Sequence, residues 1–260
     1  MNVDAYLDRI GYDGSLQTSA NTLRELHRRH LYSVPFENLD ITLGTRIELD
    51  PALLFNKIVV RHRGGFCYEL NGLFHDLLAA LGFRVSMLSG CVRHEDGGFG
   101  PEFDHMLLKV ELPDPWLADV GFGESFVDPL PLQPGAEEVE NGHLFGVIPE
   151  NGGWELFRRD SDGMEVPLYR FSDVPRQLSE YIPMCNYHQT SPDSSFTRRS
   201  ICTMALPNGR MTLAGRRLIV TTSDSREELL LESEDDLRHC LRKQFGVELG
   251  PGFEWGKLTS

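Results

Sequence analysis

The chain lacks the features that mark membrane-spanning, disulfide-stabilised and zinc-binding proteins. None of its apolar runs approaches the roughly 20 residues that a helix needs to cross a bilayer. Its 5 cysteines are an odd number without a CxxC spacing. This argues against a disulfide framework and a zinc knuckle and favours a reducing compartment. We therefore predict no metal site.

Positive charge is also scarce, because 25 basic residues face 39 acidic ones and the net charge is −14. Such a balance disfavours nucleic acid and anionic membranes as partners. The first residues lack a basic segment followed by an apolar core, so no secretory signal is predicted and we expect the protein in the cytoplasm. With 40% hydrophobic residues, 260 residues suffice for one large domain or for two or three small ones.

Three segments of different character follow one another along the chain. Residues 1–83 carry apolar residues at helical spacing, which predicts a helical bundle. Residues 84–188 predict short antiparallel strands divided by Gly, Pro and Asp turns, most simply a small barrel or sandwich. Residues 189–260 have a mixed pattern and predict an α/β lid. The fold class is thus α+β, in three domains with these boundaries.

Local signals place the ends of several elements. Asp50 before Pro51 predicts the N-terminus of a helix that buries Leu53, Leu54 and Ile58. Asn208-Gly209 predicts a β-hairpin. Ser233 predicts the start of the final helix.

Cys67 lies where a glycine turn runs into an amphipathic helix. The apolar residues at helical spacing on one face of this helix are Leu70, Leu73, Phe74, Leu77, Leu78 and Leu81. Gly82 marks the end of the helix. Unpaired amides and the helix dipole at the first turn favour an anion, so the thiol of Cys67 is predicted to tend toward the nucleophilic thiolate. A small buried apolar side chain is the alternative explanation of a cysteine at this place.

Candidate partners for the thiol lie in two predicted strands. Residues 102–112, EFDHMLLKVEL, carry His105, and residues 115–123, PWLADVGFG, carry Asp119 before a glycine-rich turn. A nucleophilic thiol needs a base, and the base needs a group that fixes its tautomer and stabilises its charged form. Papain-like enzymes use this chain order with Asn or Asp third. We predict Cys67, His105 and Asp119 as the catalytic residues, although each of the latter two alone also fits a structural role.

The segments around these residues resemble the signatures of one enzyme family, the arylamine N-acetyltransferases. The segments RGGFCYELNG, DHMLLKV and DVGFG match in order, and VPFENLDI, residues 34–41, matches the segment upstream of the cysteine. CNYHQTSPDSSFT, residues 185–197, is similar to the start of the family's third domain. The resemblance extends from the first helix to about Phe245. It implies a helical bundle, a β barrel or sandwich and an α/β lid around a cysteine-protease-like catalytic core.

The same resemblance implies an activity. Acetyl-coenzyme A would acetylate Cys67, and an arylamine, arylhydrazine or N-hydroxyarylamine would then take the acetyl group in a ping-pong reaction of xenobiotic metabolism. Arg63 and Glu37 match positions with a structural role in the family. We expect them to brace the glycine turn before Cys67, residues 63–66, which we call the cysteine loop.

By resemblance, Phe36, Phe122 and Phe196 line an apolar acceptor slot, and Val92 is placed there as well. Ordinary core packing is the alternative for each phenylalanine. No buried carboxylate is predicted in this slot. Neutral aromatic amines should therefore be preferred to lysine, whose ammonium would be desolvated without a partner.

A coenzyme site must be local, because the net charge of −14 gives no broad basic field. Gly121 and Gly123 in the DVGFGES turn are candidate donors of backbone N–H groups to the pyrophosphate, as in a glycine nest. A tight exit from the strand is the alternative explanation of these glycines. Arg216 and Arg217 of the lid are candidate phosphate contacts.

Other functions fit the same catalytic residues. Macrolactam-forming amide synthases share the expected fold but take their acyl chain from a carrier protein, so acylation by acetyl-coenzyme A is the discriminating observation. A thiol hydrolase or transglutaminase-like enzyme is a more distant alternative, and the DVGFG and VPFENL segments argue against it. A non-catalytic binding module has no reason to retain all three catalytic residues.

Overall fold

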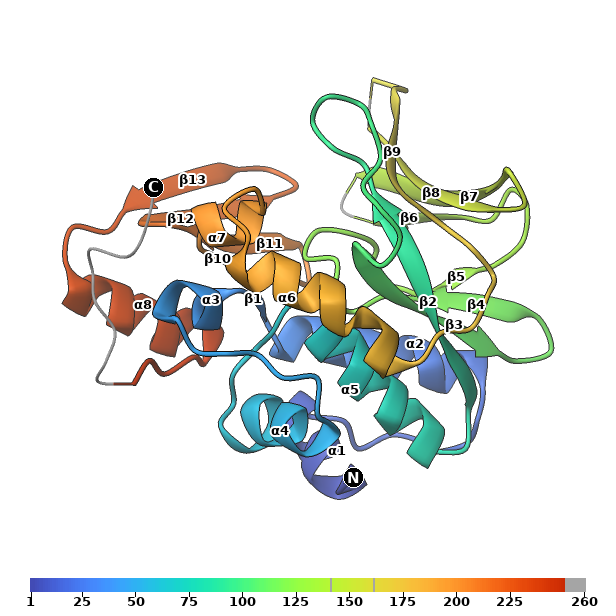
Figure 1. Cartoon of the computed structure of the whole chain (residues 1–260), viewed down its shortest axis with the longest axis horizontal. Coiled ribbons are helices and arrows are strands. Elements are labelled where there is room, and N and C mark those ends of the chain that lie inside the picture. The colour runs from blue at the N-terminus through green and yellow to red at the C-terminus, as the bar shows by residue number, and fades with distance from the viewer. Residues whose placement is uncertain (141, 161, 251–260) are drawn as a thin grey trace.

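In a computed structural model, which describes residues 1–140, 142–160 and 162–250, the first third of the chain is helical as predicted (Figure 1). Its elements are α1 (Val3–Ile10), α2 (Ala20–Ser33), α3 (Leu39–Leu43), α4 (Pro51–Phe55), the π-helical turn η1 (Asn56–Val60) and α5 (Cys67–Ala80). The helix α5 is central, since Leu70, Phe74 and Leu77 are fully buried in the main core. This core therefore fixes the helix that starts at Cys67.

The helix α4 confirms one local signal and corrects another. Asp50 accepts hydrogen bonds from the backbone N–H groups of Ala52 and Leu53 and caps the helix as predicted. Leu53, however, is 52% exposed, so its predicted burial was wrong. Leu54 and Ile58, which are four residues apart across the passage from α4 into η1, are buried as predicted.

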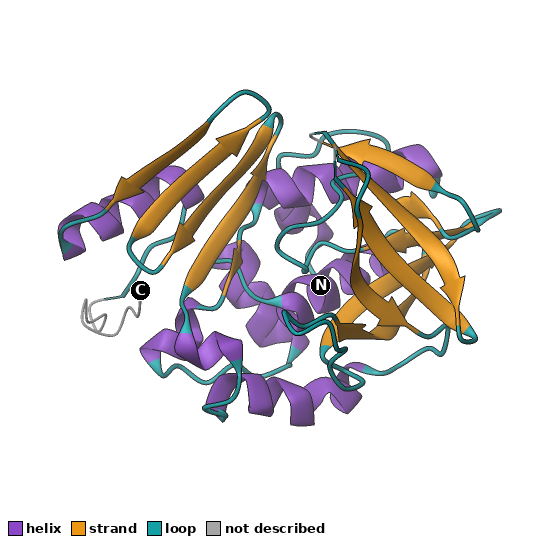
Figure 2. Cartoon of the chain, turned by 90° about the horizontal axis from the view of Figure 1, so that it is seen from above, coloured by secondary structure: helices purple, strands orange, loops and turns teal. Residues whose placement is uncertain are grey.

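The larger sheet curls into a barrel-like form, and Figure 2 shows it beside the smaller sheet with helices packed against both. Its strands are β2 (Arg84–Val92), β3 (His105–Glu111), β4 (Pro115–Ala118), β5 (Leu130–Pro131), β6 (Glu137–Glu140), β7 (His143–Glu150), β8 (Gly153–Arg159) and β9 (Glu165–Phe171). They are ordered β5-β4-β3-β2-β9-β8-β7-β6 with antiparallel neighbours. The predicted antiparallel barrel is confirmed.

The smaller sheet combines the N-terminal and C-terminal parts of the chain. Its strands are β1 (Phe36–Glu37), β10 (Ile201–Leu206), β11 (Gly209–Ala214), β12 (Arg217–Thr222) and β13 (Arg226–Leu230), in the order β1-β10-β11-β12-β13. The hairpin at Asn208-Gly209 is confirmed. The helix α8 (Glu234–Phe245) begins after Ser233, whose side chain caps it as predicted.

The structure corrects the predicted extent of β structure in the middle of the chain. Residues 178–190 form the 3-10 turn η2 (Leu178–Tyr181) and the helix α6 (Ile182–Thr190), and α7 (Ser195–Arg198) follows. Pro183 lies in the first turn of α6, where a missing backbone N–H is tolerated. The strand β9 was not predicted, because Pro167 interrupts its pattern beside a register shift after Leu156. The three domain boundaries stay a prediction.

Two histidines on α2 are buried completely, in an environment that excludes their charged forms. The His27 Nδ1 lies 2.6 Å from the carbonyl oxygen of Val127, and the His30 Nδ1 lies 2.7 Å from the hydroxyl of Tyr6. Burial lowers the pKa of His27 to about 4 and the pKa of His30 well below its usual range. Both rings are therefore neutral in the folded protein near neutral pH.

This burial predicts a loss of stability in mild acid. Above pH 6.5 His27 is neutral in both the folded and the unfolded protein. Below pH 6.5 the unfolded chain binds a proton on His27, whereas the folded protein binds it only when the pH falls to about 4. His27 alone should thus remove about 1.4 kcal/mol of unfolding free energy per pH unit, or about 3 kcal/mol in total. Urea unfolding from pH 7 to pH 4 measures this slope. The variant His27→Gln should reduce this slope by the amount that corresponds to about one bound proton. An unchanged slope would contradict the lowered pKa of His27.

Candidate active site

Cys67 is the first residue of α5 and is only 3% exposed. The residue before it, Phe66, donates its backbone N–H to the Glu69 Oε2 at 3.1 Å, which fixes the entry into the helix. Burial raises the pKa of the Cys67 thiol well above its usual range, and the backbone of Met106, next to His105, lowers it only in part. The helix start was predicted correctly, but burial opposes the expected thiolate.

His105 and Asp119 form a buried hydrogen-bonded pair. His105 is the first residue of β3, Asp119 follows β4, and 2.7 Å separate the His105 Nε2 from the Asp119 Oδ2. Burial raises the pKa of Asp119, but the charge of His105 and the hydrogen bonds to the carboxylate lower it further, to below its usual range. Asp119 is then ionised and accepts only, so the Nε2 carries the proton and the Nδ1 is left for another partner.

The carboxylate of Asp119 is saturated by the residues that the structure describes. Its Oδ2 accepts from the hydroxyl of Tyr169 at 2.9 Å as well as from His105. Its Oδ1 accepts from the Asn71 Nδ2 at 2.9 Å and from the Gly121 backbone N–H at 3.0 Å. Such a carboxylate is held in one orientation and stays charged although it is buried.

Asn71 joins the segments that carry the three predicted catalytic residues. It lies one turn after Cys67 on α5, and its Nδ2 also donates to the Met106 carbonyl at 2.6 Å. Its Oδ1 accepts the Val120 N–H at 2.9 Å. Sequence reasoning missed Asn71 and Tyr169. A polar residue at i+4 from Cys67, on the helix that buries its apolar face, was the available signal for Asn71, whereas Tyr169 belongs to the unpredicted strand β9.

Two of the predicted acceptor residues lie near the His105–Asp119 pair. The ring of Phe122 meets the ring of His105 edge-on, with centroids 5.2 Å apart, and lies 5.1 Å from the ring of Tyr169. Val92 pairs with Tyr169 across β2 and β9. Phe122 and Val92 are therefore both neighbours of groups that contact Asp119 or His105.

The other two predicted acceptor residues form an aromatic group beside the cysteine loop. The ring centroids of Phe36 and Phe196 are 6.1 Å apart, and those of Phe196 and Phe66 are 5.9 Å apart. Phe66 directly precedes Cys67. Phe36 and Phe196 are thus brought together from distant parts of the chain, and their role in acceptor binding stays a prediction.

A second imidazole–carboxylate pair lies next to these aromatic residues. The His188 Nε2 of α6 is 3.3 Å from the Asp104 Oδ1, and the Asp104 side chain is only 12% exposed. The His188 ring lies 5.2 Å from the ring of Phe196. A nearly buried carboxylate is therefore close to the predicted slot, contrary to the expectation that there is none.

The glycine turn after Asp119 packs against the cysteine loop. A Cβ on Gly121 would lie 2.8 Å from the Cys67 Cα, so only glycine fits there. Its N–H is already donated to Asp119. Gly123 has a φ of +93°, and its carbonyl accepts a hydrogen bond from Arg210, a residue that was not predicted. Coenzyme binding by Gly121 and Gly123 stays a prediction, and Gly121 would have to contribute without its N–H.

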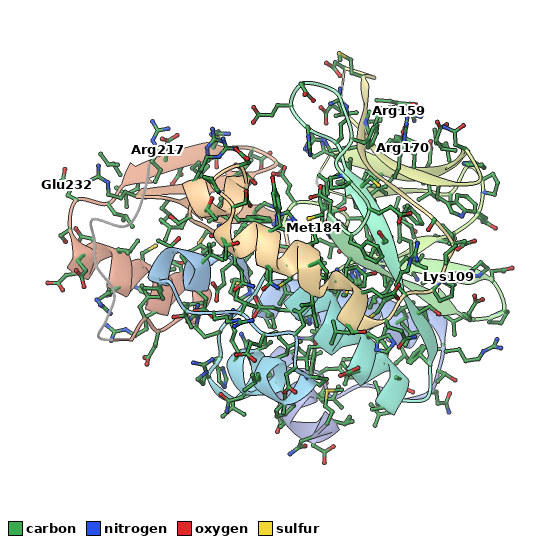
Figure 3. All side chains as sticks on the ribbon, in the orientation of Figure 1. Lys109, Arg159, Arg170, Met184, Arg217 and Glu232 are labelled. Carbon is green, nitrogen blue, oxygen red and sulfur yellow. The ribbon has the colours of Figure 1, made fainter. Side chains whose placement is uncertain are left out.

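The two predicted phosphate-binding arginines lie on the outer side of the smaller sheet. Arg217 opens β12, and its Nε lies 3.1 Å from the Glu228 Oε1 of β13. Figure 3 shows Arg217 over these outer strands, well apart from Met184 of α6. Arg216 directly precedes β12, and its carbonyl accepts the Leu231 N–H at 2.8 Å. The coenzyme contacts of Arg216 and Arg217 stay a prediction.

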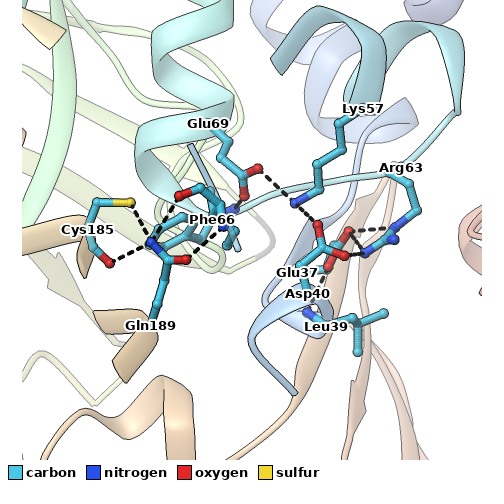
Figure 4. Close-up of polar contacts among 10 residues, drawn as sticks. Glu37, Leu39, Asp40, Lys57, Arg63, Phe66, Glu69, Cys185 and Gln189 are labelled. Carbon is cyan, nitrogen blue, oxygen red and sulfur yellow. Dashed lines mark hydrogen bonds and ion pairs between the residues drawn. The ribbon is translucent and has the colours of Figure 1, made fainter. Parts of the chain in front are cut away.

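A buried network of charged side chains supports the cysteine loop (Figure 4). Arg63 binds the Glu37 Oε1 at 2.7 Å and the Asp40 Oδ1 at 2.9 Å, which confirms its expected structural position. Lys57 of η1, which was not predicted, lies 2.8 Å from the Asp40 Oδ2 and 2.7 Å from the Glu69 Oε1. Since Glu69 also accepts the Phe66 N–H, the network reaches the residue before Cys67.

Removing the cation at the centre of this network should be strongly destabilising. The variant Lys57→Met leaves the buried Glu69 without its cation and Asp40 with Arg63 alone, and we expect a loss of about 3–5 kcal/mol of unfolding free energy. Lys109→Met is the matched control, because Lys109 pairs with Glu111 and with Asp173, whose side chain is 46% exposed, and should change stability by at most about 1 kcal/mol. Urea unfolding compares the two. Equal effects would show that the network does not stabilise the fold.

Neither a metal site nor a membrane span emerges from the part of the chain that the structure describes. Within residues 1–140, 142–160 and 162–250, His, Cys, Asp and Glu side chains form no group of three that could hold a metal ion. In the same ranges no helix combines the length and the apolar character that crossing a bilayer requires.

Comparison with known proteins identifies the family. Residues 19–253 match the N-acetyltransferase family. Arylamine N-acetyltransferase 1 of Homo sapiens is 32% identical over 96% of this chain and 95% of its own length, and the arylamine N-acetyltransferase of Mycolicibacterium smegmatis is 34% identical over 96% and 93%. The Mycobacterium marinum arylamine N-acetyltransferase in complex with CoA superimposes with a TM-score of 0.89 at 31% identity, over 99% of this chain and 97% of that chain.

The fold and these matches define an acyltransferase. The chain belongs to the arylamine N-acetyltransferase family.

Proposed function

We propose that this enzyme transfers the acetyl group of acetyl-coenzyme A to arylamines, arylhydrazines and N-hydroxyarylamines through an acetyl-Cys67 intermediate. The observation that carries the proposal is the 2.7 Å bond from the His105 Nε2 to the Asp119 Oδ2, next to a thiol at the N-terminus of α5. The family supplies the reaction class, and the CoA complex of the M. marinum relative supports coenzyme A as the donor.

The first half-reaction needs a proton transfer, because burial raises the pKa of the Cys67 thiol. A lone thiolate is disfavoured there, but a thiolate with an imidazolium is neutral as a pair and is desolvated at lower cost. His105 accepts the thiol proton, and the ionised Asp119 stabilises the resulting imidazolium. Cys67 then attacks the thioester carbonyl, the carbon–sulfur bond to coenzyme A breaks, and His105 returns the proton to the leaving thiol.

The second half-reaction reverses these roles. The acceptor nitrogen attacks the acetyl-Cys67 carbonyl, His105 accepts the proton from nitrogen, and the Cys67 thiolate leaves. One site therefore serves both substrates in turn, which is the basis of ping-pong kinetics. Phe122 against His105, and Phe36 with Phe196 beside Phe66, support a flat apolar acceptor site. We place the reaction in the cytoplasm and in xenobiotic metabolism, with no metal.

The nucleophile is tested by labelling. Acetyl-coenzyme A without acceptor should add one acetyl group to the protein, and intact mass measurement followed by peptide mapping should locate it on Cys67. Cys67→Ala should abolish both labelling and turnover, because Cys67 is the proposed nucleophile, at the start of the helix whose Asn71 bonds Asp119. Cys91→Ala, on the neighbouring strand β2, is the matched control and should retain activity. Turnover by Cys67→Ala would refute the mechanism.

The same labelling separates the proposal from the carrier-protein-dependent amide synthase. An enzyme of that type would stay unlabelled by acetyl-coenzyme A and would accept acyl chains only from a carrier protein. Label on Cys67 that an added arylamine removes as its N-acetyl product excludes this alternative. Peptide hydrolysis without acetyl transfer would instead favour the thiol hydrolase.

The acceptor site is tested by measuring the half-reactions separately. Removing a buried aromatic contact in Phe122→Ala or Phe196→Ala should cost on the order of 1–3 kcal/mol of acceptor binding, seen as a higher KM for the amine. Acetylation of Cys67 should change less, because it precedes binding of the amine. Stopped-flow acylation and amine titration of the preformed acetyl-enzyme measure the two steps. If acylation fails while amine use is normal, these residues belong to the coenzyme site.

A further inference from the structure

We infer that His27 is a positioning residue of the active site, which holds the main chain of Asp119 in place through its unprotonated Nε2. The inference rests on the proposed function, because it assigns Asp119 to the catalytic set. It adds a residue from α2, an element that carries none of the catalytic or substrate-binding residues proposed above.

The hydrogen bonds of His27 fix its tautomer. The backbone N–H of Asp119 donates to the His27 Nε2 at 3.0 Å, so this nitrogen must carry a lone pair. The opposite nitrogen, Nδ1, lies 2.6 Å from the carbonyl oxygen of Val127 and must therefore carry the proton. One neutral ring thus connects α2 to both ends of the segment from Asp119 to Val127.

The surroundings of His27 hold the ring in this place. It is fully buried, stacks on Phe126 at 5.7 Å with an interplanar angle of 10°, and meets Phe74 of α5 edge-on at 6.0 Å. Among the charged and titratable groups that face it, Asp119 follows β4, Asp128 follows Val127, and His30 lies on α2 itself. Burial outweighs the two carboxylates and lowers the pKa of His27 to about 4.

Protonation of the His27 Nε2 would turn its hydrogen bond with the Asp119 N–H into a repulsive contact. A proton on the Nε2 would face the Asp119 N–H, and two donors cannot share a hydrogen bond. Moving this N–H moves the Cα of Asp119, and with it the carboxylate that must reach His105, Tyr169 and Asn71 at once. Small displacements of catalytic groups cost large factors in rate. The active site therefore requires neutral His27.

Two substitutions separate the positioning contact from simple packing. Gln places an amide oxygen near the position of the Nε2, where it can accept the Asp119 N–H. Asn ends near the position of the Nδ1 and can retain only the bond to Val127. We expect His27→Gln to keep kcat within about 3-fold of wild type and His27→Asn to lose about 10-fold or more in both half-reactions. The KM of the amine should change little, since His27 does not contact the proposed slot.

His30→Gln is the matched control. His30 lies one turn further along α2, is equally buried and neutral, and bonds Tyr6 rather than the segment of Asp119. Its substitution should lower the Tm and leave kcat per folded molecule unchanged. Alkylation of Cys67 by iodoacetamide against pH adds a readout without acetyl-coenzyme A, and its acid limb should be displaced in His27→Asn but not in His27→Gln.

The ¹⁵N chemical shifts of the ring report the same contact in the unaltered enzyme, so the test survives a variant that fails to fold. We expect the neutral Nδ1–H tautomer of His27 at pH 7. An imidazolium at pH 7, equal kcat for the Gln and Asn variants, or an equal loss in His30→Gln would overturn the inference. If wild type neither labels nor turns over, the proposed function fails, while the tautomer and the alkylation profiles still decide the role of His27.

Discussion

The buried charge of Asp119 is the constraint on which the rest of the site depends. A carboxylate away from water must have its oxygens satisfied, and the described donors come from α5, β3, β9 and the glycine turn. Moving any one of these elements leaves part of the charge uncompensated. The helical region and the barrel are therefore fixed to each other at the proposed catalytic site, and the orientation of His105 follows from the same bonds.

Much of this arrangement could be predicted from local sequence. The start of α5 at Cys67, the cap at Asp50, the hairpin at Asn208-Gly209 and the strand that begins at His105 each have a short-range cause. Asn71, Tyr169, His27 and Lys57 escaped prediction because their partners are distant in sequence and no periodicity connects them. Buried polar side chains of this kind look like interruptions of an apolar pattern until their partners are known. Of the three residues predicted to be buried in this helix only Leu53 was wrong, since the inward face is formed by Leu54 and Ile58.

Burial acts in the same direction on the pKa of two proposed catalytic residues, Cys67 and Asp119, but their neighbours do not. It raises the pKa of the Cys67 thiol, and it would raise that of Asp119 if His105 and the other donors did not outweigh it. In the proposed mechanism the imidazole of His105 connects the two groups, because it bonds Asp119 and accepts the proton of the thiol. The buried cations Arg63 and Lys57 are paired with carboxylates of their own below the cysteine loop. In a chain with a net charge of −14, these two buried cations thus support the structure around the site.

The short strand β1 has a consequence for the order in which the enzyme matures. Phe36 pairs with Thr203 of β10, and Asn38 donates to the carbonyls of Phe196 and Arg199. A nascent chain on the ribosome already contains Cys67, His105 and Asp119 before any of these partners has been made. Closing so long a loop is also slow, because its entropy must be lost before the contacts form. The contact between Phe36 and Phe196 can therefore form only after most of the chain has been synthesised, which delays completion of the proposed acceptor site until late in biogenesis.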